Sequence, residues 1–250
     1  MERIGQFTWQ IKIPFEKIYT SVFVIEDGKK HIVLDCGDGV QDVHRYVVPE
    51  LQRAGISPDI LVLSHHHRDH SGGADAMKEA FPKLCILSLD PLALKDLKCK
   101  ADKLDIENKL SAHVKVLHLS GHSRDCVALY ETRDKILLSV DALQQWGVDR
   151  WGTCVADVRA YRRSLERVAE LGARYVIASH DFDPLGAVAE GKEEIEELLS
   201  ECQETLYDIE DMIYDHPEKS AEELLALYAA LYPNRPVTSK TTIKAILSKT

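Results

Sequence analysis

The feature that most constrains this chain is a cluster of histidines and one aspartate directly after a run of apolar residues. Residues 60–63 read Ile-Leu-Val-Leu, which predicts a buried strand, and the cluster that follows contains His65, His67, Asp69 and His70. Burying such side chains without partners costs on the order of several kcal/mol, so packing does not explain them. Imidazole nitrogen and carboxylate oxygen are ligands that zinc and similar divalent ions take from proteins. We therefore predict a metal site here rather than a histidine-rich polar loop.

Histidine and aspartate recur where other predicted strands end. Three further examples lie downstream: His122 after residues 114–119, Asp141 after residues 136–140 and His180 after residues 175–178. Asp35 also ends a predicted strand, residues 31–34, and its pattern leaves two interpretations open. Its carboxylate either accepts a hydrogen bond from a ligand histidine or belongs to a simple turn.

The ordered series His65-x-His67-x-Asp69-His70, Gly121-His122, Asp141 and His180 resembles the metallo-β-lactamase superfamily, and within it the glyoxalase II and lactonase-like branch. The resemblance covers roughly residues 20–185. It implies an α+β fold, an αββα sandwich in which two mixed sheets lie face to face with helices outside and metals at the strand ends. Some residues next to these ligands differ from the family's common pattern, such as Val140 where a glycine is usual. The resemblance therefore does not fix the subfamily.

Carried over position by position, the resemblance implies two metal sites. The first takes His65, His67 and His122, the second takes Asp69, His70 and His180, and the carboxylate of Asp141 bridges them. We expect two divalent ions and take zinc as the default, although iron and manganese also suit nitrogen and oxygen donors.

The resemblance further implies a dinuclear metal-dependent hydrolase. A metal-bridging hydroxide would attack a small ester, thioester or lactone, with Asp69 as the catalytic residue that orients the hydroxide and passes on its proton. Three alternatives stay open: phosphodiester cleavage, iron-dependent oxygen or redox chemistry, and a metal sensor without catalysis. The formal net charge of −10 argues against nucleic acid as a partner, and the full second ligand set is more than a single iron needs.

The segment after Asp141 supplies the candidate substrate contacts Trp146, Arg150 and Trp151. The tryptophans either form an apolar pocket wall or anchor their loop in the core. Arg150 either contacts a carboxylate or phosphate of the substrate or makes a surface ion pair.

The chain divides by pattern into a catalytic domain, residues 1–188, and a C-terminal helical extension, residues 189–250. Ser220 and Glu223 form a capping-box pattern within the extension. In the first domain, we expect a helix over residues 41–54 with a kink or break at Pro49, and another over residues 91–98.

Composition places this chain among ordinary globular proteins. Its 250 residues suffice for one sizeable core, and its 6 cysteines form no CxxC pair. The N-terminal residues lack the apolar segment of a signal peptide, and no run approaches membrane-spanning length. We therefore expect a cytoplasmic protein that acts on a small molecule without a membrane partner, and a homodimer is compatible with the sequence.

Overall fold

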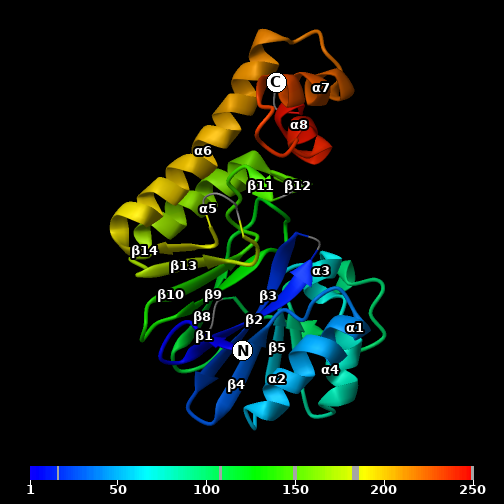
Figure 1. Cartoon of the computed structure of the whole chain (residues 1–250), viewed down its shortest axis with the longest axis vertical. Helices are drawn as coiled ribbons and strands as arrows, with labels where there is room; N and C mark the ends of the chain where they lie inside the picture. The colour runs from blue at the N-terminus through cyan, green and yellow to red at the C-terminus, as the bar shows by residue number, and fades with distance from the viewer. Residues whose placement is uncertain (16, 107–108, 149–150, 182–185, 249–250) are drawn as a thin grey trace.

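Two mixed β-sheets lie face to face, with helices on their outer sides (Figure 1). The structure is a computed structural model that describes residues 1–15, 17–106, 109–148, 151–181 and 186–248. This architecture confirms the predicted αββα sandwich.

The first sheet has the order β1-β2-β3-β4-β5-β6-β7. Its strands are β1 (Glu2–Arg3), β2 (Thr8–Phe15), β3 (Ile18–Asp27), β4 (Lys30–Leu34), β5 (Ile60–Leu63), β6 (Cys85–Ser88) and β7 (Asp102–Lys103). Strands β1 to β4 pair antiparallel, whereas β4 to β7 pair parallel. The change of direction at β4 sends the carboxyl ends of β4 and β5 to the same edge.

The second sheet has the order β14-β13-β10-β9-β8, and a separate two-stranded sheet pairs β11 with β12. The strands are β8 (Val114–His118), β9 (Val127–Glu131), β10 (Ile136–Val140), β11 (Gly147–Val148), β12 (Trp151–Gly152), β13 (Tyr175–Ala178) and β14 (Val188–Glu190). Strands β10 and β13 are parallel, and the other pairs are antiparallel.

Helices cover both outer faces (Figure 1). The first sheet carries α1 (Val40–Asp42), α2 (Val48–Arg53), α3 (Arg68–Ser71) and α4 (Ala74–Ala80), with a π-helical turn over Val43–Val47. The second sheet and the top of the molecule carry α5 (Val158–Glu170), α6 (Gly191–Asp215), α7 (Ala221–Leu231) and α8 (Lys240–Leu247). None of the described helices is long and apolar enough to cross a membrane.

The helix predicted over residues 41–54 is interrupted next to Pro49: the π-helical turn Val43–Val47 ends there, and α2 begins at Val48 with the proline in its first two positions, where proline is tolerated. The other local prediction was wrong. The segment expected to be helical over residues 91–98 forms only a 3-10 turn, Pro91–Ala93. In that turn the Asp90 carboxylate accepts a hydrogen bond from the Leu92 amide, and this local bond does not extend to a longer helix.

Strand β3 explains how the sandwich forms its layers. Val22 and Val24 pack with the helical side of the first sheet, whereas Phe23 and Ile25 pack toward the second sheet, and all four are fully buried. Alternate side chains of a strand point to opposite faces, so an uninterrupted apolar run predicts a strand covered on both sides. Each such side chain contributes about 1.5–3 kcal/mol through burial.

The C-terminal helices share the core of the second sheet. Leu206, Leu224 and Ile243 come from α6, α7 and α8, and each is fully buried in the cluster that also contains Leu137 of β10. The predicted capping box is present at Ser220. The domain boundary at residue 188 stays a prediction.

Asp27, at the end of β3, gives a test of how the sheets are joined. Its buried carboxylate accepts hydrogen bonds from the backbone N–H of His113 (2.9 Å) and from the ring Nδ1 of His113 (2.7 Å). Burial raises the pKa of Asp27, but the neighbouring Ser111 and His113 lower it by more, to about 2. The ionised form therefore stabilises the fold above pH 3.8, the carboxyl's ordinary pKa, and this stability is lost as the pH falls toward 2.

We expect Asp27→Asn to lower the free energy of unfolding at pH 7 by about 1–2 kcal/mol. The difference from wild type should narrow by roughly half at pH 3, where the unfolded chain binds the proton that the folded carboxylate excludes. Urea unfolding of both proteins at the two pH values measures it, with the exposed Asp96→Asn as control. A difference that is unchanged at pH 3 would contradict this account.

Candidate metal centre

Strand ends from both sheets meet at the candidate site. The parallel pair β4 and β5 is followed directly by Asp35 and Ser64, and the parallel pair β10 and β13 leads into Asp141 and His180. Parallel neighbours bring their carboxyl ends to one edge, and side chains that follow them converge there.

Hydrogen bonds between the sheets fix this edge. The Ser64 carbonyl accepts from the backbone N–H of Val127 in β9 at 2.9 Å. The Ser179 carbonyl accepts from the N–H of Ser21 in β3 at 3.0 Å and from its hydroxyl at 2.8 Å. These bonds hold the loop before His65 and the loop before His180 against the opposite sheet.

Two residues next to the site have unusual backbone conformations. Gly121, before His122, has φ +141°, and a Cβ on it would lie 2.5 Å from the Cα of Tyr161 in α5, so only glycine allows this approach. Val140, before Asp141, has φ 48°, a left-handed conformation that costs a β-branched residue about 1–3 kcal/mol. The strained valine occupies the position where the resembled family commonly has glycine.

The structure brings together all seven residues that the sequence nominated as metal ligands. They form three overlapping groups whose ligand atoms lie within 4.8 Å of one another: His65, His67 and His122; His65, His70 and Asp141; and Asp69, His70 and His180. Sequence positions that span residues 65–180 therefore share one small volume.

Asp141 faces both halves of this cluster. Its Oδ1 lies 3.4 Å from Nε2 of His70 and 3.5 Å from Nε2 of His180. Its Oδ2 lies 3.8 Å from Nε2 of His122, which in turn is 2.9 Å from Nδ1 of His67. The two carboxylate oxygens thus point to two different sets of donors, as a shared carboxylate between two cations would.

The second ring nitrogen of each of four imidazoles contacts an oxygen. The contacts are His65 Nδ1 with Ser64 Oγ (2.9 Å), His70 Nδ1 with Asp35 Oδ2 (2.8 Å), His122 Nδ1 with the Cys154 carbonyl (2.8 Å) and His180 Nδ1 with the Tyr19 carbonyl (2.9 Å). Such partners fix the ring orientation and direct Nε2 to the centre. The sequence analysis identified Asp35 and missed the other three, two of which act through backbone carbonyls that have no residue signature.

Asp35 joins β4, β5 and the candidate centre. Its carboxylate accepts from the Ser64 N–H at 2.7 Å, from the Ser64 hydroxyl at 2.8 Å and from His70. Its φ of 65° turns the chain at this point. Of the two open interpretations, the structure therefore supports the hydrogen bond to a candidate ligand histidine.

The donor atoms fit divalent cations. His70 Nε2 and Asp141 Oδ1 are buried, and neither makes a hydrogen bond within the described residues. The two atoms lie 3.4 Å from each other as an ion pair, and a bound cation would supply the partner that each lacks. The set contains nitrogen and oxygen but no thiolate, which suits zinc, iron or manganese.

Electrostatics divide the imidazoles into two types. Burial lowers the pKa of His65 well below its ordinary value, and burial with the neighbouring His122 lowers the pKa of His67 to about 4. Burial also opposes charge on His180, but the adjacent Asp141 raises the pKa of His180 to about 10. His65 and His67 are therefore neutral at pH 7, as metal ligands must be.

Neighbouring carboxylates determine the pKa of the second type of imidazole, which comprises His70 and His180. Burial alone would lower the pKa of His70, but Asp69, Asp141 and Asp35 raise it well above its ordinary value. Burial alone would raise the pKa of Asp69. The neighbouring His70 and His180 lower it by more, so that it falls below its ordinary value. Metal binding at these positions has to release protons from the imidazoles, because only the neutral ring can coordinate.

The predicted substrate contacts are only partly described. Trp146 is half-buried, and the guanidinium of Arg235 lies 4.8 Å from its ring centre, so the C-terminal part of the chain covers it. Arg150 lies outside the described residues, and the side chain of Trp151 is not described either. His66, between two candidate ligands, contacts the buried carboxylate of Asp125 through Nδ1 at 2.9 Å.

Comparison with known sequences gives one family match and several relatives. A family model described as the metallo-beta-lactamase superfamily matches residues 17–84. An atrochrysone carboxyl ACP thioesterase of Passalora fulva is 26% identical over 191 residues, covering 74% of this chain and 51% of that protein. A hydroxyacylglutathione hydrolase of Xanthomonas campestris pv. campestris is 29% identical over 171 residues, covering 67% and 62%. The chain thus spans 51% to 62% of the length of these two relatives.

Solved structures share the fold. A metallo-beta-lactamase family protein of Thermus thermophilus superimposes with a TM-score of 0.72 at 17% identity, over 98% of this chain and 92% of that one. A metallo-beta-lactamase of Pseudomonas aeruginosa in its mono-zinc form gives 0.65 at 18% identity, over 81% and 94%. At these identities the likeness concerns the architecture alone.

We expect Asp35→Asn to weaken zinc binding about 10- to 100-fold while the protein stays folded. Asparagine keeps the shape but replaces one acceptor oxygen with an N–H₂ group, so a bond to His70 or Ser64 is lost. Competition with a chromogenic chelator measures the affinity, and circular dichroism reports the fold. The matched control is Asp38→Asn in the same loop, whose partially exposed carboxylate pairs with Arg68 at 2.9 Å. Unchanged zinc affinity in Asp35→Asn would contradict the positioning role.

Proposed function

We propose that this chain, a member of the metallo-β-lactamase superfamily, is a dinuclear metal-dependent hydrolase of small thioesters, with esters and lactones as related substrates. The observation that carries the proposal is Asp141, whose two oxygens face separate donor sets at 3.4–3.5 Å and 3.8 Å. The names of the relatives, a thioesterase and a hydroxyacylglutathione hydrolase, support hydrolysis of the thioester type.

The residues divide between two proposed sites. His65, His67 and His122 would hold one cation, and Asp69, His70 and His180 would hold the other, with Asp141 shared. We take zinc as the ion in both. When bound, such a pair lowers the pKa of water toward neutrality and polarises the carbonyl that is attacked.

Asp69 has the position of a catalytic carboxylate. Its side chain is 23% exposed, whereas that of His70 beside it is fully buried. An ionised carboxylate at the border of the site accepts a hydrogen bond from the attacking water and so orients it. The same group can then carry the released proton to the leaving group.

How strongly the rate of hydrolysis depends on this proton is set by the leaving group. A thiol has a pKa near 8.5 and departs readily as the thiolate, whereas an alkoxide needs a proton as the bond to it breaks. The proton-carrying role of Asp69 should therefore matter more for an oxygen ester than for a thioester with the same acyl group.

We expect both Asp69→Asn and Asp141→Ala to lower turnover about 100-fold or more, since each removes a charged group from the reacting centre. In Asp69→Asn, the loss should be larger for the oxygen ester than for the matched thioester. Initial rates with the two substrates measure this, on protein whose metal content has been determined, and circular dichroism verifies the fold.

Near-wild-type turnover in both variants would contradict the proposal. A screen that also includes phosphodiesters and oxygen uptake separates it from the alternatives, because activity on those substrates alone would reject thioester hydrolysis. Hydrolysis that persists after removal of metal by a chelator would reject metal dependence.

A further inference from the structure

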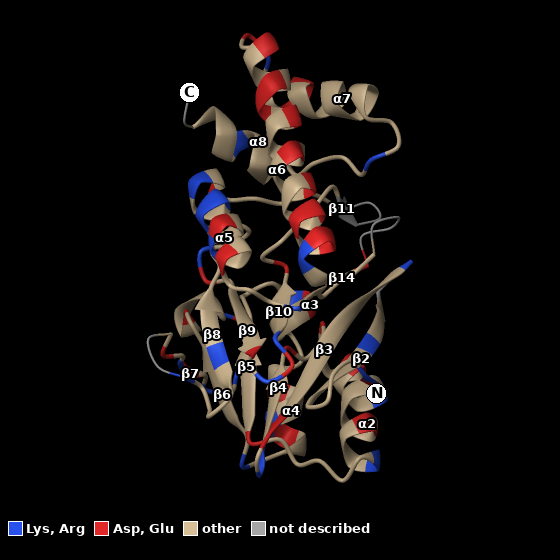
Figure 2. Ribbon diagram, turned by 90° about the vertical axis from the view of Figure 1, so that its left-hand side faces the viewer, with Lys and Arg blue, Asp and Glu red and all other residues tan. Residues whose placement is uncertain are grey.

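The Cys154 carbonyl, which contacts the candidate ligand His122, belongs to a segment that is in contact with the start of α8. The described parts of this segment are residues 142–148 and 151–156, between Asp141 and α5. Helix α8 lies against α5, α6 and α7, above β11 and β12 (Figure 1, Figure 2). A hydrogen bond joins the segment to α8 across 87 positions of the sequence.

That bond belongs to the Thr242 hydroxyl, which holds both neighbours of Cys154. The hydroxyl donates to the Thr153 carbonyl at 2.8 Å and accepts from the Val155 N–H at 2.9 Å. Thr153, Val155 and Thr242 are all fully buried. Because Cys154 is the single residue between the two bonded backbone groups, this hydroxyl fixes its position from both sides.

Further contacts from the residues before α8 reinforce this position. The Thr153 carbonyl also accepts from the Thr238 hydroxyl at 3.0 Å and from the Ser239 N–H at 3.0 Å. A Cβ on Gly152 would lie 1.9 Å from the Val237 carbonyl oxygen, so only glycine allows the two backbones to approach this closely. The start of α8 and the segment before α5 therefore form a specific contact.

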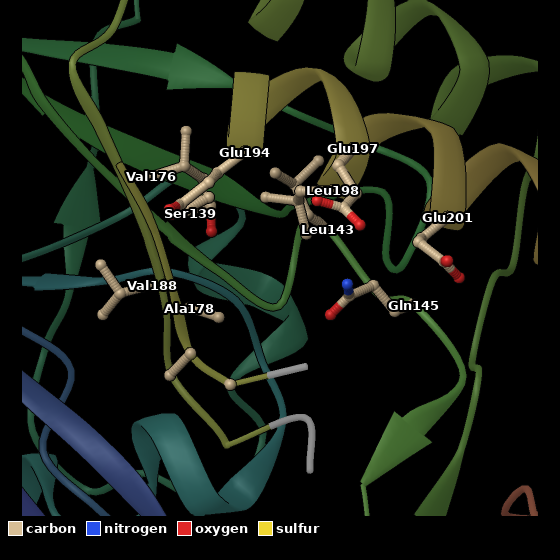
Figure 3. A pocket seen from close by; sticks show the side chains of 13 residues that line it. Ser139, Leu143, Gln145, Val176, Ala178, Val188, Glu194, Glu197, Leu198 and Glu201 are labelled. Carbon is tan, nitrogen blue, oxygen red and sulfur yellow. The ribbon is translucent and has the colours of Figure 1, made fainter. Parts of the chain in front are cut away.

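One side of the segment borders a cavity. Leu143 and Gln145 line this cavity, which has a volume of about 420 Å³ and lies between β13 and α6 (Figure 3). The Thr153 hydroxyl donates to the Gln145 carbonyl at 2.5 Å, so this part of the segment is joined directly to Thr153. Since packing on the cavity side is incomplete, the position of the segment depends more on its contacts with α8.

Cys154 in turn orients a candidate ligand. Its carbonyl accepts from Nδ1 of His122 at 2.8 Å, and its N–H donates to the side-chain oxygen of Gln144 at 2.7 Å. Nε2 of His122 lies 3.2 Å from Nε2 of His65 and 2.9 Å from Nδ1 of His67. A displaced carbonyl would therefore turn the His122 ring away from the other two imidazoles, with which it forms the group that we call the first cation site.

We propose that Thr242 is a positioning residue of the first cation site. Its hydroxyl holds the two neighbours of Cys154, and the Cys154 carbonyl then directs Nε2 of His122. Groups at the end of β4 and in β3 orient His70 and His180 of the other site instead, so the effect of Thr242 is confined to one of the two sites. The inference rests on the proposed function, because that function supplies the cations.

The hydroxyl can be removed without removing what seats α8. Ile243 and Ile246 bury their side chains in the apolar core, and the Ser239 side chain caps the helix by accepting from the Thr242 N–H. Thr242→Val keeps the branched shape and these contacts, but leaves the Val155 N–H without its acceptor.

The test is a zinc titration of the full-length protein carrying ¹⁵N-labelled histidine, in a chelator buffer that sets the free zinc concentration. Signals of the ring nitrogens report zinc binding at each imidazole separately. We expect Thr242→Val to weaken zinc binding at His122 and the rest of the first cation site about 10- to 100-fold. Binding at His70 and His180 should weaken much less.

Two matched variants separate positioning from a general loss of stability. Thr242→Ser keeps the hydroxyl and should restore zinc binding at His122. Thr205→Val removes another buried hydroxyl of the C-terminal helices, which donates to the Glu201 carbonyl within α6, and it should bind zinc like wild type. Thermal unfolding verifies the fold of each variant.

Unchanged zinc affinity at His122 in Thr242→Val would overturn the inference. Equal weakening at both sites would do the same, as would a loss in Thr242→Ser or Thr205→Val as large as that in Thr242→Val.

The metal-free protein separates this inference from the proposed function. There, the Nδ1 proton of His122 should exchange with water at least about tenfold faster in Thr242→Val than in wild type, because its acceptor is no longer held. An unchanged exchange rate would overturn the role of Thr242. If the wild-type protein binds no zinc at the cluster, the proposed function fails, and the exchange rate still decides what Thr242 does.

Discussion

The structure depends on how three carboxylates and several imidazoles are accommodated at one edge of the sandwich. Asp35, Asp141 and His70 are almost completely buried, and taking a charged group of this size out of water costs on the order of several kcal/mol even after relaxation. Mutual pairing offsets part of that cost, since it raises the pKa of His70 and His180 and lowers the pKa of Asp69 and Asp141. Two buried candidate ligand atoms, His70 Nε2 and Asp141 Oδ1, make no hydrogen bond with the described residues, and their position suits a cation.

The arrangement of strands follows from this need for convergence. Two parallel pairs, β4 with β5 and β10 with β13, bring four chain segments to the same edge, and hydrogen bonds to the carbonyls of Ser64 and Ser179 fix the sheets to each other there. The tight approach at Gly121 and the strained backbone at Val140 adjust the last positions. The apolar core packs against both faces of β3, and so joins the two layers behind this edge.

Much of this was predictable, because the information lay in residue types and periodicity. Apolar runs bounded by turns identified most strands, and the spacing of histidine and aspartate identified the seven residues that the structure brings together. The sandwich itself followed from resemblance rather than from the strand pattern. For Asp35 the sequence left two interpretations open, a hydrogen bond to a ligand histidine and a simple turn, and the structure supports the hydrogen bond.

The rest depended on contacts that the sequence does not encode locally. The carbonyls of Tyr19 and Cys154 orient His180 and His122, yet any residue could supply them. The expected helix over residues 91–98 ends after Pro91–Ala93, because Leu94 has a non-helical backbone conformation with φ −86° and ψ 56°.

The central claim is that the seven clustered residues hold two cations. Anomalous X-ray diffraction from crystals of the zinc-loaded protein, recorded on both sides of the zinc absorption edge, tests it most directly. The account predicts two peaks per chain, one among His65, His67 and His122 and one among Asp69, His70 and His180, with Asp141 between them. Absence of zinc from this cluster at saturating metal, or a single peak coordinated by residues elsewhere, would contradict it.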